Sequence, residues 1–382
     1  MFALAIVVGA PASINAQEVT LAGFAFGGLA AEVSSRFPFA ADVIQGLSVE
    51  SLAGPSAMSR IVVERSRAAQ NSSFDLTFDS LASLRDSDQA LVAALVLTGE
   101  TVFTENFSNY HKVYVSLRGD ALLFDYQSKT VVKTTPLSAV SFDVTAAAPT
   151  AQQIRSHVSR LLRGPEAESL VSQFVHAMSV TTLPAPGMRT FQVRTVDIAS
   201  AALAQFPPAL QSAGLARSLV VDALESSIAS ATGVPLVPSR VTHATGVMYL
   251  RFEDAYDYEL TIPAGDYVFD LTLTRLAKAE YASNNVATTY IFGAFVEMEL
   301  LEPLLEKVFF SSSLINGETA VVPAGRLAAN DFPGYEDALR GLFRKFASAI
   351  AGANLSWVSE ASPEVDIADQ IRQTSELIRR SR

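Results

Sequence analysis

Two segments of the chain, Val115–Leu137 and Phe292–Leu314, read as the same strand-turn-strand unit written twice. A repeat of this kind predicts two similar domains in tandem. Since a one-residue slip in register turns every side chain to the other face of a sheet, Val131 and Val308 are expected on the same side of their sheets. Aligned without a gap, Leu123, Asp125, Val131, Val132, Thr134, Thr135 and Leu137 correspond to Leu300, Glu302, Val308, Phe309, Ser311, Ser312 and Leu314.

Length and composition agree with two domains. The chain has 382 residues, which is too many for one hydrophobic core and suits two domains of roughly 100 to 200 residues each. Hydrophobic residues make up 49% of it, so each domain can bury a sizeable core. The expected division is a signal peptide at 1–16, a first domain at 17–180, a linker at 181–190, a second domain at 191–352 and a tail with a short helix at 353–382.

Charge and cysteine content exclude several classes of protein. The net charge of -11 argues against nucleic-acid binding, which needs clustered Lys and Arg to neutralise phosphates. The C-terminal arginines form a small basic group, which fits the preference of helix C-termini for cations: Arg372, Arg379, Arg380 and Arg382. The chain has no cysteine, which excludes disulfides, thiol catalysis, thiolate zinc sites and an acylated cysteine anchor.

The N-terminal segment predicts export. Phe2–Ala10 is an apolar run, Pro11 ends it, and Ile14-Asn15-Ala16 resembles a signal-peptide cleavage site. The usual basic residues before the apolar run are missing, since the first basic residue is Arg36. A buried strand or helix is the alternative. We expect a periplasmic or extracellular protein.

In the first half, hydrophobic periodicity predicts a meander followed by helices. Leu91–Phe103 reads as a long strand, and His111–Phe124 alternates between apolar and polar residues before Val131–Thr135. These strands are expected to form an antiparallel meander with one covered face. Thr150–Arg163 is predicted as a capped helix, and a second helix follows at Glu166–Met178.

The second half repeats this order at greater length. A helix is predicted at Leu215–Ala231, and an amphipathic helix at Tyr335–Ile350 would cover the second meander. The tail segment Pro363–Arg380 could pack on the body, bind a partner or fray. The expected fold is therefore α+β, with two tandem similar domains, each an antiparallel meander covered by amphipathic helices. The predicted strands are Val247–Phe252, Tyr258–Ile262, Tyr267–Leu276, Thr288–Leu301 and Lys307–Leu314.

The histidines do not form a recognisable site. No two share the i, i+4 spacing that would place them on one helical face. Structural positions are expected for all of them: His111, His157, His176 and His243. We therefore predict no catalytic, metal-binding or cofactor-binding residue, and no cofactor.

Other candidate patterns have plain structural interpretations. An acidic stretch lacks the order of a calcium loop and is expected on a solvated strand face and hairpin: Glu253, Asp254, Asp257, Glu259, Asp266 and Asp270. The glycines Gly23, Gly27 and Gly28 do not match a nucleotide-binding motif, and no Gly-x-Ser-x-Gly elbow is present. Of the adjacent rings Phe309 and Phe310, one is expected to point inward and the other outward.

The stretch from Tyr114-Val115-Ser116-Leu117-Arg118 through Leu123-Phe124-Asp125-Tyr126-Gln127-Ser128-Lys129-Thr130-Val131-Val132 resembles a strand pair of bacterial envelope proteins. These envelope proteins are of the curli-channel, flagellar-ring and TolB N-terminal kind. The similarity covers about forty residues in each half of the chain. The second copy departs from it, with Glu302-Pro303-Leu304-Leu305 at the turn. The resemblance implies a non-catalytic periplasmic module that works through protein contacts, and it assigns no functional residue.

Three functions follow from these observations. The first is an exported, non-catalytic envelope protein acting in assembly or protein interaction, with other envelope proteins or further copies of itself as partners, peripheral association with a membrane complex and no nucleic acid. The second is a hydrolase with scattered Ser, His and Asp residues, in which His111 or His243 would be the base and lie within about 3.2 Å of a serine hydroxyl. The third is a small-ligand carrier, which needs a cavity of at least ~300 Å³.

Overall fold

The structure is a computed structural model. The expected signal peptide at 1–16 lies outside the described residues. The described residues are 17–381 except 79–83, 85–89, 107–109, 186, 242, 253–256, 324–330 and 354.

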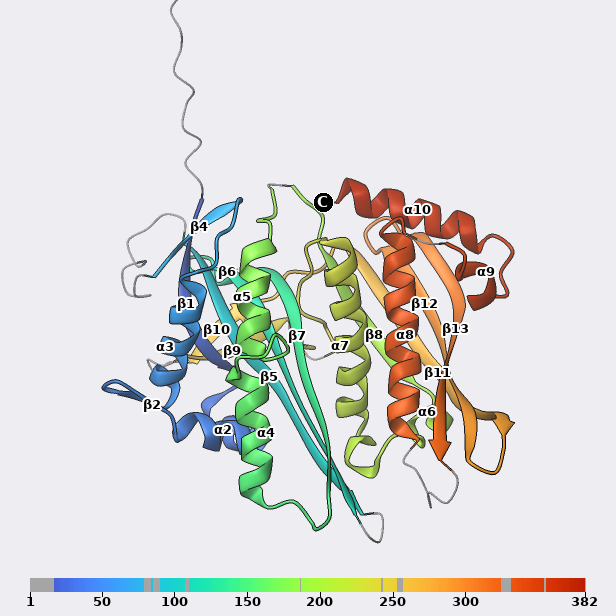
Figure 1. The fold of residues 1–382 in the computed structure, drawn as a ribbon. Helices are drawn as coiled ribbons and strands as arrows, with labels where there is room; N and C mark the ends of the chain where they lie inside the picture. Colours follow the sequence, from blue (N-terminus) through green and yellow to red (C-terminus); the bar gives the residue numbers. More distant parts are fainter. Residues whose placement is uncertain are drawn as a thin grey trace, which may run out of the picture.

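The first unit consists of a sheet with helices on one face (Figure 1). Its main strands are β1 (Gln17–Gly27), β5 (Leu91–Asn106), β6 (His111–Asp125) and β7 (Thr130–Thr145), with β4 (Phe74–Thr77) beside β1. Strand β1 runs parallel to β5, whereas β5, β6 and β7 form an antiparallel meander. The remaining elements are η1 (Ala30–Glu32), α1 (Val33–Arg36), α2 (Pro38–Gln45), β2 (Ser48–Val49), β3 (Leu52–Ala53), α3 (Gly54–Ser66), α4 (Ala151–Arg163) and α5 (Leu170–Val180).

The second unit shares the core order of the first, which is a strand, a helical segment, a three-stranded meander and covering helices. Its sheet contains β13 (Lys307–Pro323), β12 (Ala287–Glu302), β11 (Tyr267–Ser283) and β8 (Phe191–Ile198), in that spatial order. Strand β8 is parallel to β11, as β1 is to β5. Its helical segments are α6 (Ser200–Leu203), η3 (Pro208–Leu210), α7 (Ala213–Thr232), α8 (Phe332–Ile350), α9 (Val358–Ala361) and α10 (Ile367–Arg380).

The two hairpins agree in detail. Both turns contain a non-glycine residue with positive φ at the equivalent position, Lys129 (φ 53) and Glu306 (φ 51). The register between β6 and β7 shifts at Val132, and that between β12 and β13 shifts at the equivalent Phe309. Such bulges fix which face each side chain takes. The expected α+β fold with two tandem similar units is therefore confirmed.

The predicted facing of Val131 and Val308 is also confirmed. Phe124 pairs with Val131, and its counterpart Leu301 pairs with Val308. The preceding residue in each hairpin, Leu123 or Leu300, packs into the core under the helices. Val131 and Val308 therefore lie on the face away from those helices, which we call the outer face.

The outer face of the first sheet is covered, contrary to the expected meander with one covered face. Strands β9 (Val247–Arg251) and β10 (Asp257–Thr261) form a hairpin; β10 pairs with β7 and β9 pairs with β1, so the strip of strands closes on itself. A separate apolar cluster fills the space inside, including Val92, Leu122 and Met248. Strands from the second half of the chain thus contribute to both sheets.

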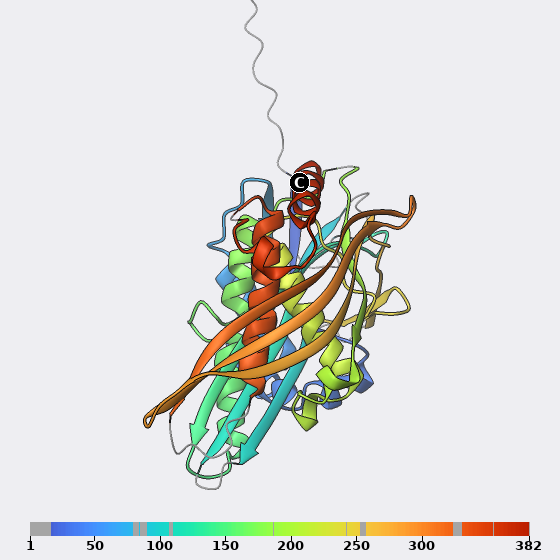
Figure 2. The same ribbon diagram turned by 90° about the vertical axis from the view of Figure 1, so that its right-hand side faces the viewer.

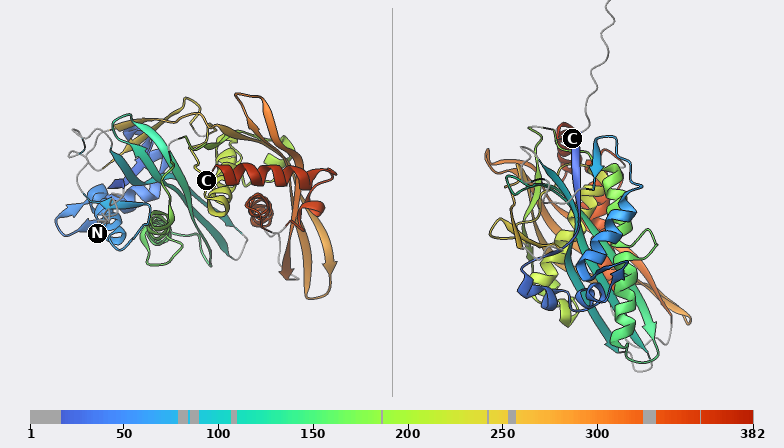
Figure 3. Two further views of the ribbon diagram at one scale, coloured as in Figure 1. Left: turned by 90° about the horizontal axis from the view of Figure 1, so that it is seen from above. Right: turned by 90° about the vertical axis from the view of Figure 1, so that its left-hand side faces the viewer.

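Helix α7 lies between the two sheets (Figures 1 and 3). Its apolar side, which includes Leu219, Ala223, Leu224 and Ile228, belongs to the core of the second unit. Its other side faces β7 of the first sheet. A single residue also links the sheets, because Leu236 pairs with Thr134 on β7 and with Phe191 on β8.

The amphipathic helices cover the meanders as predicted. Thr150 caps α4 in a capping box with Gln153. On the second sheet α8 packs under β12 and β13, and Phe310 meets Phe346 of α8 with ring centroids 5.0 Å apart. The inward position of Phe310 is confirmed, whereas Phe309 at the bulge is partly buried against Tyr267.

The C-terminal helix α10 packs on the body of the protein, which resolves the three alternatives left by the sequence. Ile367, Ile371 and Ile378 join the core of the second unit. Gln370 accepts a hydrogen bond from the backbone N–H of Ser311 at 2.8 Å, so α10 covers part of the twisted β13 edge seen in Figure 2. Among the described helices, none is both long and apolar enough to cross a membrane.

Candidate functional site

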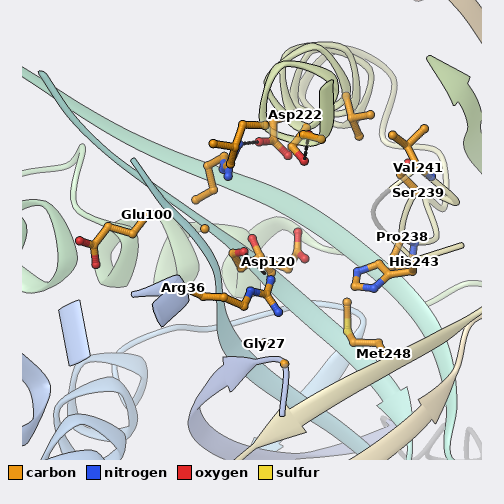
Figure 4. Close-up of a pocket in the computed structure, with 18 of the residues that line it drawn as sticks. Gly27, Arg36, Glu100, Asp120, Asp222, Pro238, Ser239, Val241, His243 and Met248 are labelled. Carbon is orange, nitrogen blue, oxygen red and sulfur yellow. Dashed lines mark hydrogen bonds and ion pairs between the residues drawn. The ribbon is translucent and has the colours of Figure 1, made fainter. Parts of the chain in front are cut away.

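A cavity of about 1040 Å³ lies at the junction of the two units. Its walls come from the outer face of the first sheet, from helix α7, from residues 27–39 after β1 and from the segment 238–249 that leads into β9. Figure 4 shows Asp222 reaching in from α7, Arg36 and Asp120 in the middle, and His243 with Met248 on the far side.

The first sheet contributes Arg118 and Asp120. Alternation along β6 places Leu117 and Leu123 in the core under the helices, so the even-numbered neighbours point to the outer face. Gly99 lies opposite Arg118 on β5. The guanidinium of Arg118 passes directly over Gly99. A Cβ atom on residue 99 would overlap the guanidinium nitrogens.

Helix α7 contributes Ser218, Asp222 and Glu225. Their spacing places them on one face of the helix, opposite the stripe that packs into the second core. The helix predicted at Leu215–Ala231 is thus present, with an apolar side in the second core and a polar side that forms a wall of the cavity.

Arg118 and Asp222 form an ion pair across the junction. Arg118 Nη1 lies 3.1 Å from Asp222 Oδ2, and both side chains are largely buried. Burial raises the pKa of Asp222, while the charges of Arg118 and Arg340 oppose that rise. The pair therefore ties β6 of the first unit to α7 of the second.

Two further carboxyl groups face the cavity. Burial raises the pKa of Asp120 to about 7, with the nearby Asp222 adding to the shift and Arg118 opposing it. Glu225 is 7% exposed, and its Oε1 has no hydrogen-bond partner. Burial and the charges of Asp120 and Asp222 raise the pKa of Glu225 well above its ordinary value.

Arg36 and His243 also line the cavity. Arg36 Nη2 donates to the carbonyl oxygen of Thr98 at 3.2 Å, and Nη1 lies 3.7 Å from Glu32. Burial lowers the pKa of His243 to about 4, and the charge of Arg36 lowers it further. His243 is therefore uncharged at neutral pH.

Glu100 lines the cavity but has a structural function. Its carboxylate accepts hydrogen bonds from the backbone N–H groups of Phe39 at 3.0 Å and Ala40 at 2.7 Å, at the start of α2. A carboxylate at a helix N-terminus satisfies free N–H groups and the helix dipole. This anchors α2 to strand β5.

Of the four histidines, His243 reaches the cavity. His157 instead lies between Ser141 and Asp143, with Nδ1 3.2 Å from Ser141 Oγ and Nε2 3.1 Å from Asp143 Oδ2. The distances expected of a hydrolase triad are thus met at His157, which was expected to be structural. Among the described residues, no such arrangement is found at the proposed bases His111 and His243.

This group is not arranged as a nucleophile. Arg160 Nη2 donates to Ser141 Oγ at 2.9 Å and lies 3.1 Å from His157 Nδ1, so a cation sits where the base would receive its proton. Neither this cavity nor the depression described below includes these residues. We assign the group to the attachment of α4 to β7.

The acidic stretch is engaged in ion pairs. Asp257 lies 3.2 Å from Arg251 across the β9–β10 hairpin, and Asp266 lies 2.7 Å from Arg189. Asp270 pairs with Arg194, and Glu253 and Asp254 lie outside the described residues. In the described part of the chain, no three His, Asp or Glu side chains form a group that could hold a metal ion.

Sequence reasoning missed the carboxylates that meet in the cavity. Arg118 and Asp120 lie in the predicted strand His111–Phe124, and Asp222 and Glu225 lie in the predicted helix Leu215–Ala231. The one available signal was that Gly119 separates two opposite charges within a strand otherwise rich in apolar residues. Which polar faces meet depends on the packing of the two units.

A second, shallower depression of about 340 Å³ lies on the outer face of the second sheet. Its lining includes Glu297 on β12 and Ser311 on β13, which occupy the positions of Asp120 and Thr134 in the first unit. No part of the described chain comparable to α7 covers this face, and Glu297 and Glu299 are exposed.

Comparisons with known proteins do not show a family. Protein-family models and curated proteins give no match. Among solved structures, a protein from Xanthomonas campestris described as DUF330 has 13% identity and a TM-score of 0.23; it is covered over 87% of its length and this chain over 44%.

Two further structures are similar at the same level. A neuraminyllactose-binding hemagglutinin homolog from Helicobacter pylori has 10% identity and a TM-score of 0.26, with 51% of this chain and 94% of that chain covered. A minor lipoprotein from Acinetobacter baumannii has 10% identity and a TM-score of 0.21, with 43% and 91% covered. These bacterial proteins are consistent with envelope-type modules, and at such TM-scores the likeness carries no argument about function.

Proposed function

We propose that this protein is an exported, non-catalytic component of the bacterial envelope that binds a small molecule in the cavity between its two units. The apolar segment Phe2–Ala10 supports export. We also propose that the chain is divided into two domains, 17–180 and 191–352, joined by a linker at 181–190. Cell fractionation tests the compartment, and a cytoplasmic protein that retains its N-terminus would contradict it.

The cavity is the single observation that carries ligand binding. Its volume of about 1040 Å³ matches the upper end of the range for small-molecule sites. Its walls combine apolar side chains such as Val241 and Met248 with a buried polar atom, Glu225 Oε1, that has no hydrogen-bond partner among the described residues. A structural interface would be expected to satisfy such groups.

A hydrolase is less well supported. The candidate group at His157 has a guanidinium on its serine hydroxyl and lies away from the cavity. In the cavity, Arg118 engages Asp222, and His243 has a depressed pKa, which makes it a weak base at neutral pH.

Ligand binding can be tested by filling the cavity from α7. We would screen a library of small metabolites for compounds that raise the melting temperature of the wild-type protein, and repeat the screen with Ser218→Trp. Ser218 lines the cavity, and its hydroxyl bonds only to the carbonyl oxygen of Gly214 on its own helix among the contacts described.

Ser230→Trp is the matched control. Ser230 lies on the same helix, bonds in the same way to Ser226 and is exposed outside the cavity. Compounds that stabilise the wild type and Ser230→Trp but not Ser218→Trp would support the proposal. A library without such a compound, or with hits that are indifferent to both changes, would refute it.

A second candidate function is assembly with another copy of this chain through the outer face of the second sheet. This face exposes Val308, Ile315 and Val321 beside charges of both signs, Arg275 and Glu297. A two-fold axis would place each sign of charge opposite the other. Light scattering should then give a dimer that Ile315→Arg dissociates, whereas a monomeric wild type would exclude it.

A further inference from the structure

We infer that the ligand of the cavity is an organic cation carrying an amine or guanidinium group, with Asp120, Asp222 and Glu225 as its counter-charges. This rests on the proposed function and specifies the chemical class of the ligand.

The charged groups of the wall do not balance. Arg36 is placed beside Glu32, and Arg118 pairs with Asp222. Asp120 and Glu225 also line the cavity, and neither has an ion pair among the described residues. The wall thus has an excess of acidic groups that a bound cation would neutralise.

The excess acids include a group that is both deeply buried and unpaired. Glu225 is 7% exposed, and its Oε1 accepts no hydrogen bond. Asp222 Oδ2 also lacks a hydrogen bond of good geometry, although it lies 3.1 Å from Arg118. A buried oxygen without a donor is costly, and an ammonium or guanidinium group would supply three or five donors respectively.

Protons and a ligand cation would compete for these acidic groups. The raised pKa of Asp120, about 7, keeps this group largely protonated at mildly acidic pH, and burial with the charges of Asp120 and Asp222 shifts the pKa of Glu225 in the same direction. A ligand cation would stabilise their ionised forms and release protons to the solvent. Binding should therefore tighten as the pH rises from 6 to 8.

The walls favour an organic cation over a metal ion. In the described chain, no three acidic or histidine side chains are close enough to hold a metal. The space is far larger than one ion, and Val102, Val221 and Met248 offer apolar contacts for a hydrocarbon chain. An anionic ligand is disfavoured because Arg36 and Arg118 already have acidic neighbours.

The test is calorimetric titration with four compounds of similar length. Putrescine and agmatine are the cationic probes, 1,4-butanediol is the neutral match and succinate is the anionic match. We expect the cations alone to bind, more tightly at pH 8 than at pH 6. Repeating the titration in buffers of different ionisation enthalpy should show net proton release.

Substitutions at the carboxylates locate the binding. Glu225→Gln and Asp120→Asn should each weaken cation binding at least tenfold, whereas Glu297→Gln, at the equivalent of Asp120 in the second unit, should leave it unchanged. Circular dichroism checks that each variant folds, and two independent variants guard against the loss of one.

The outcomes separate this inference from the proposed function. Binding of succinate or butanediol, without the cations and sensitive to Ser218→Trp, would overturn the cationic ligand and leave the ligand-binding function intact. Failure of both cations to bind also overturns the inference. The proposed function falls only if the wider library yields no compound that depends on the cavity.

Discussion

The outer faces of the two sheets carry similar residues and have different surroundings. Asp120 and Thr134 on the first sheet are matched by Glu297 and Ser311 on the second. Helix α7 and residues 238–249 cover the first face and enclose about 1040 Å³, whereas the second face is open and its depression measures about 340 Å³. A binding cavity therefore arises from what covers the strands, on a sheet plan that is common to both units.

The remaining differences follow from this covering. Leu122 is buried in the closed first sheet, whereas its counterpart Glu299 faces solvent. The cross-strand pair Gly99–Arg118 directs its arginine to Asp222, whereas in the equivalent pair Arg275 lies 3.8 Å over the ring of Phe295. The equivalent cross-strand pairs thus each contain an arginine. Among the described contacts, Arg118 joins the two units, whereas Arg275 packs on Phe295 within its own sheet.

The largest expected effect comes from exchanging the residues at one equivalent position. Leu122→Glu places a carboxylate in a dry apolar cluster and should lower the free energy of unfolding by ~4 kcal/mol or more. Glu299→Leu, on the open face, should change it by less than ~0.5 kcal/mol. Urea denaturation measures both, and similar losses in the two variants would contradict the difference between the faces.

The two arginines give the next test. Arg118→Met leaves Asp222 buried without its cation and should cost ~2–3 kcal/mol at neutral pH. Arg275→Met removes a solvent-facing contact with Phe295 and should cost under ~1 kcal/mol. Thermal unfolding of both variants at pH 7 makes the comparison. Equal costs would show that the inter-unit ion pair contributes no more than the surface contact.

The third test uses pH at Asp120. Its pKa is about 7 in the folded protein against an ordinary value of 3.8, so the folded state holds the proton more tightly. Its contribution to stability is present below pH ~4 and is lost as the pH rises towards 7. Asp120→Asn should therefore be more stable than wild type by ~1–3 kcal/mol at pH 8 and about equal at pH 4.

Glu297→Gln is the control for this titration. Glu297 is exposed on the open face, so its substitution should leave stability within ~0.5 kcal/mol at both pH values. Denaturant unfolding at pH 4 and pH 8 gives both differences. A pH-independent Asp120→Asn would show that the first face is as well solvated as the second.

The smallest effect concerns the starts of the covering helices. Thr150 caps α4 through its hydroxyl, and Thr150→Ala should cost ~1 kcal/mol. Asp331 precedes α8 without a cap hydrogen bond and pairs instead with Lys278 at 2.6 Å, so Asp331→Ala should cost less, ~0.5 kcal/mol. Thermal unfolding resolves the order, and the reverse order would contradict it.

Local sequence patterns predicted much of the fold. The meander strands and the helices at Thr150–Arg163 and Tyr335–Ile350 are present because their apolar periods are long and regular. The pairing of β9 and β10 with the first sheet could not be predicted in this way, since strand partners far apart in sequence leave no mark on local periodicity. The expectation of an open outer face failed for that reason.

The candidate site was less accessible to sequence reasoning than the fold. Arg118 and Asp120 lie within the predicted alternating strand His111–Phe124. Alternation shows that one side of a strand is polar, but it does not show whether water or another part of the protein lies against that side. Asp222 and Glu225 on α7 meet them through tertiary packing alone. The hydrolase hypothesis named His111 or His243 as the base, whereas the expected distances occur at His157, beside the guanidinium of Arg160.

The dependence of the first sheet on β9 and β10 has a consequence for the newly made chain. Strands β1 to β7 are complete long before Val247 is synthesised, so the outer face around Leu122 and Phe124 remains bare for that interval. Bare apolar strands are prone to aggregate. A chaperone that binds the nascent chain would protect this face until strands β9 and β10 are made. A chain truncated before Val247 would never cover the face and would continue to need the chaperone.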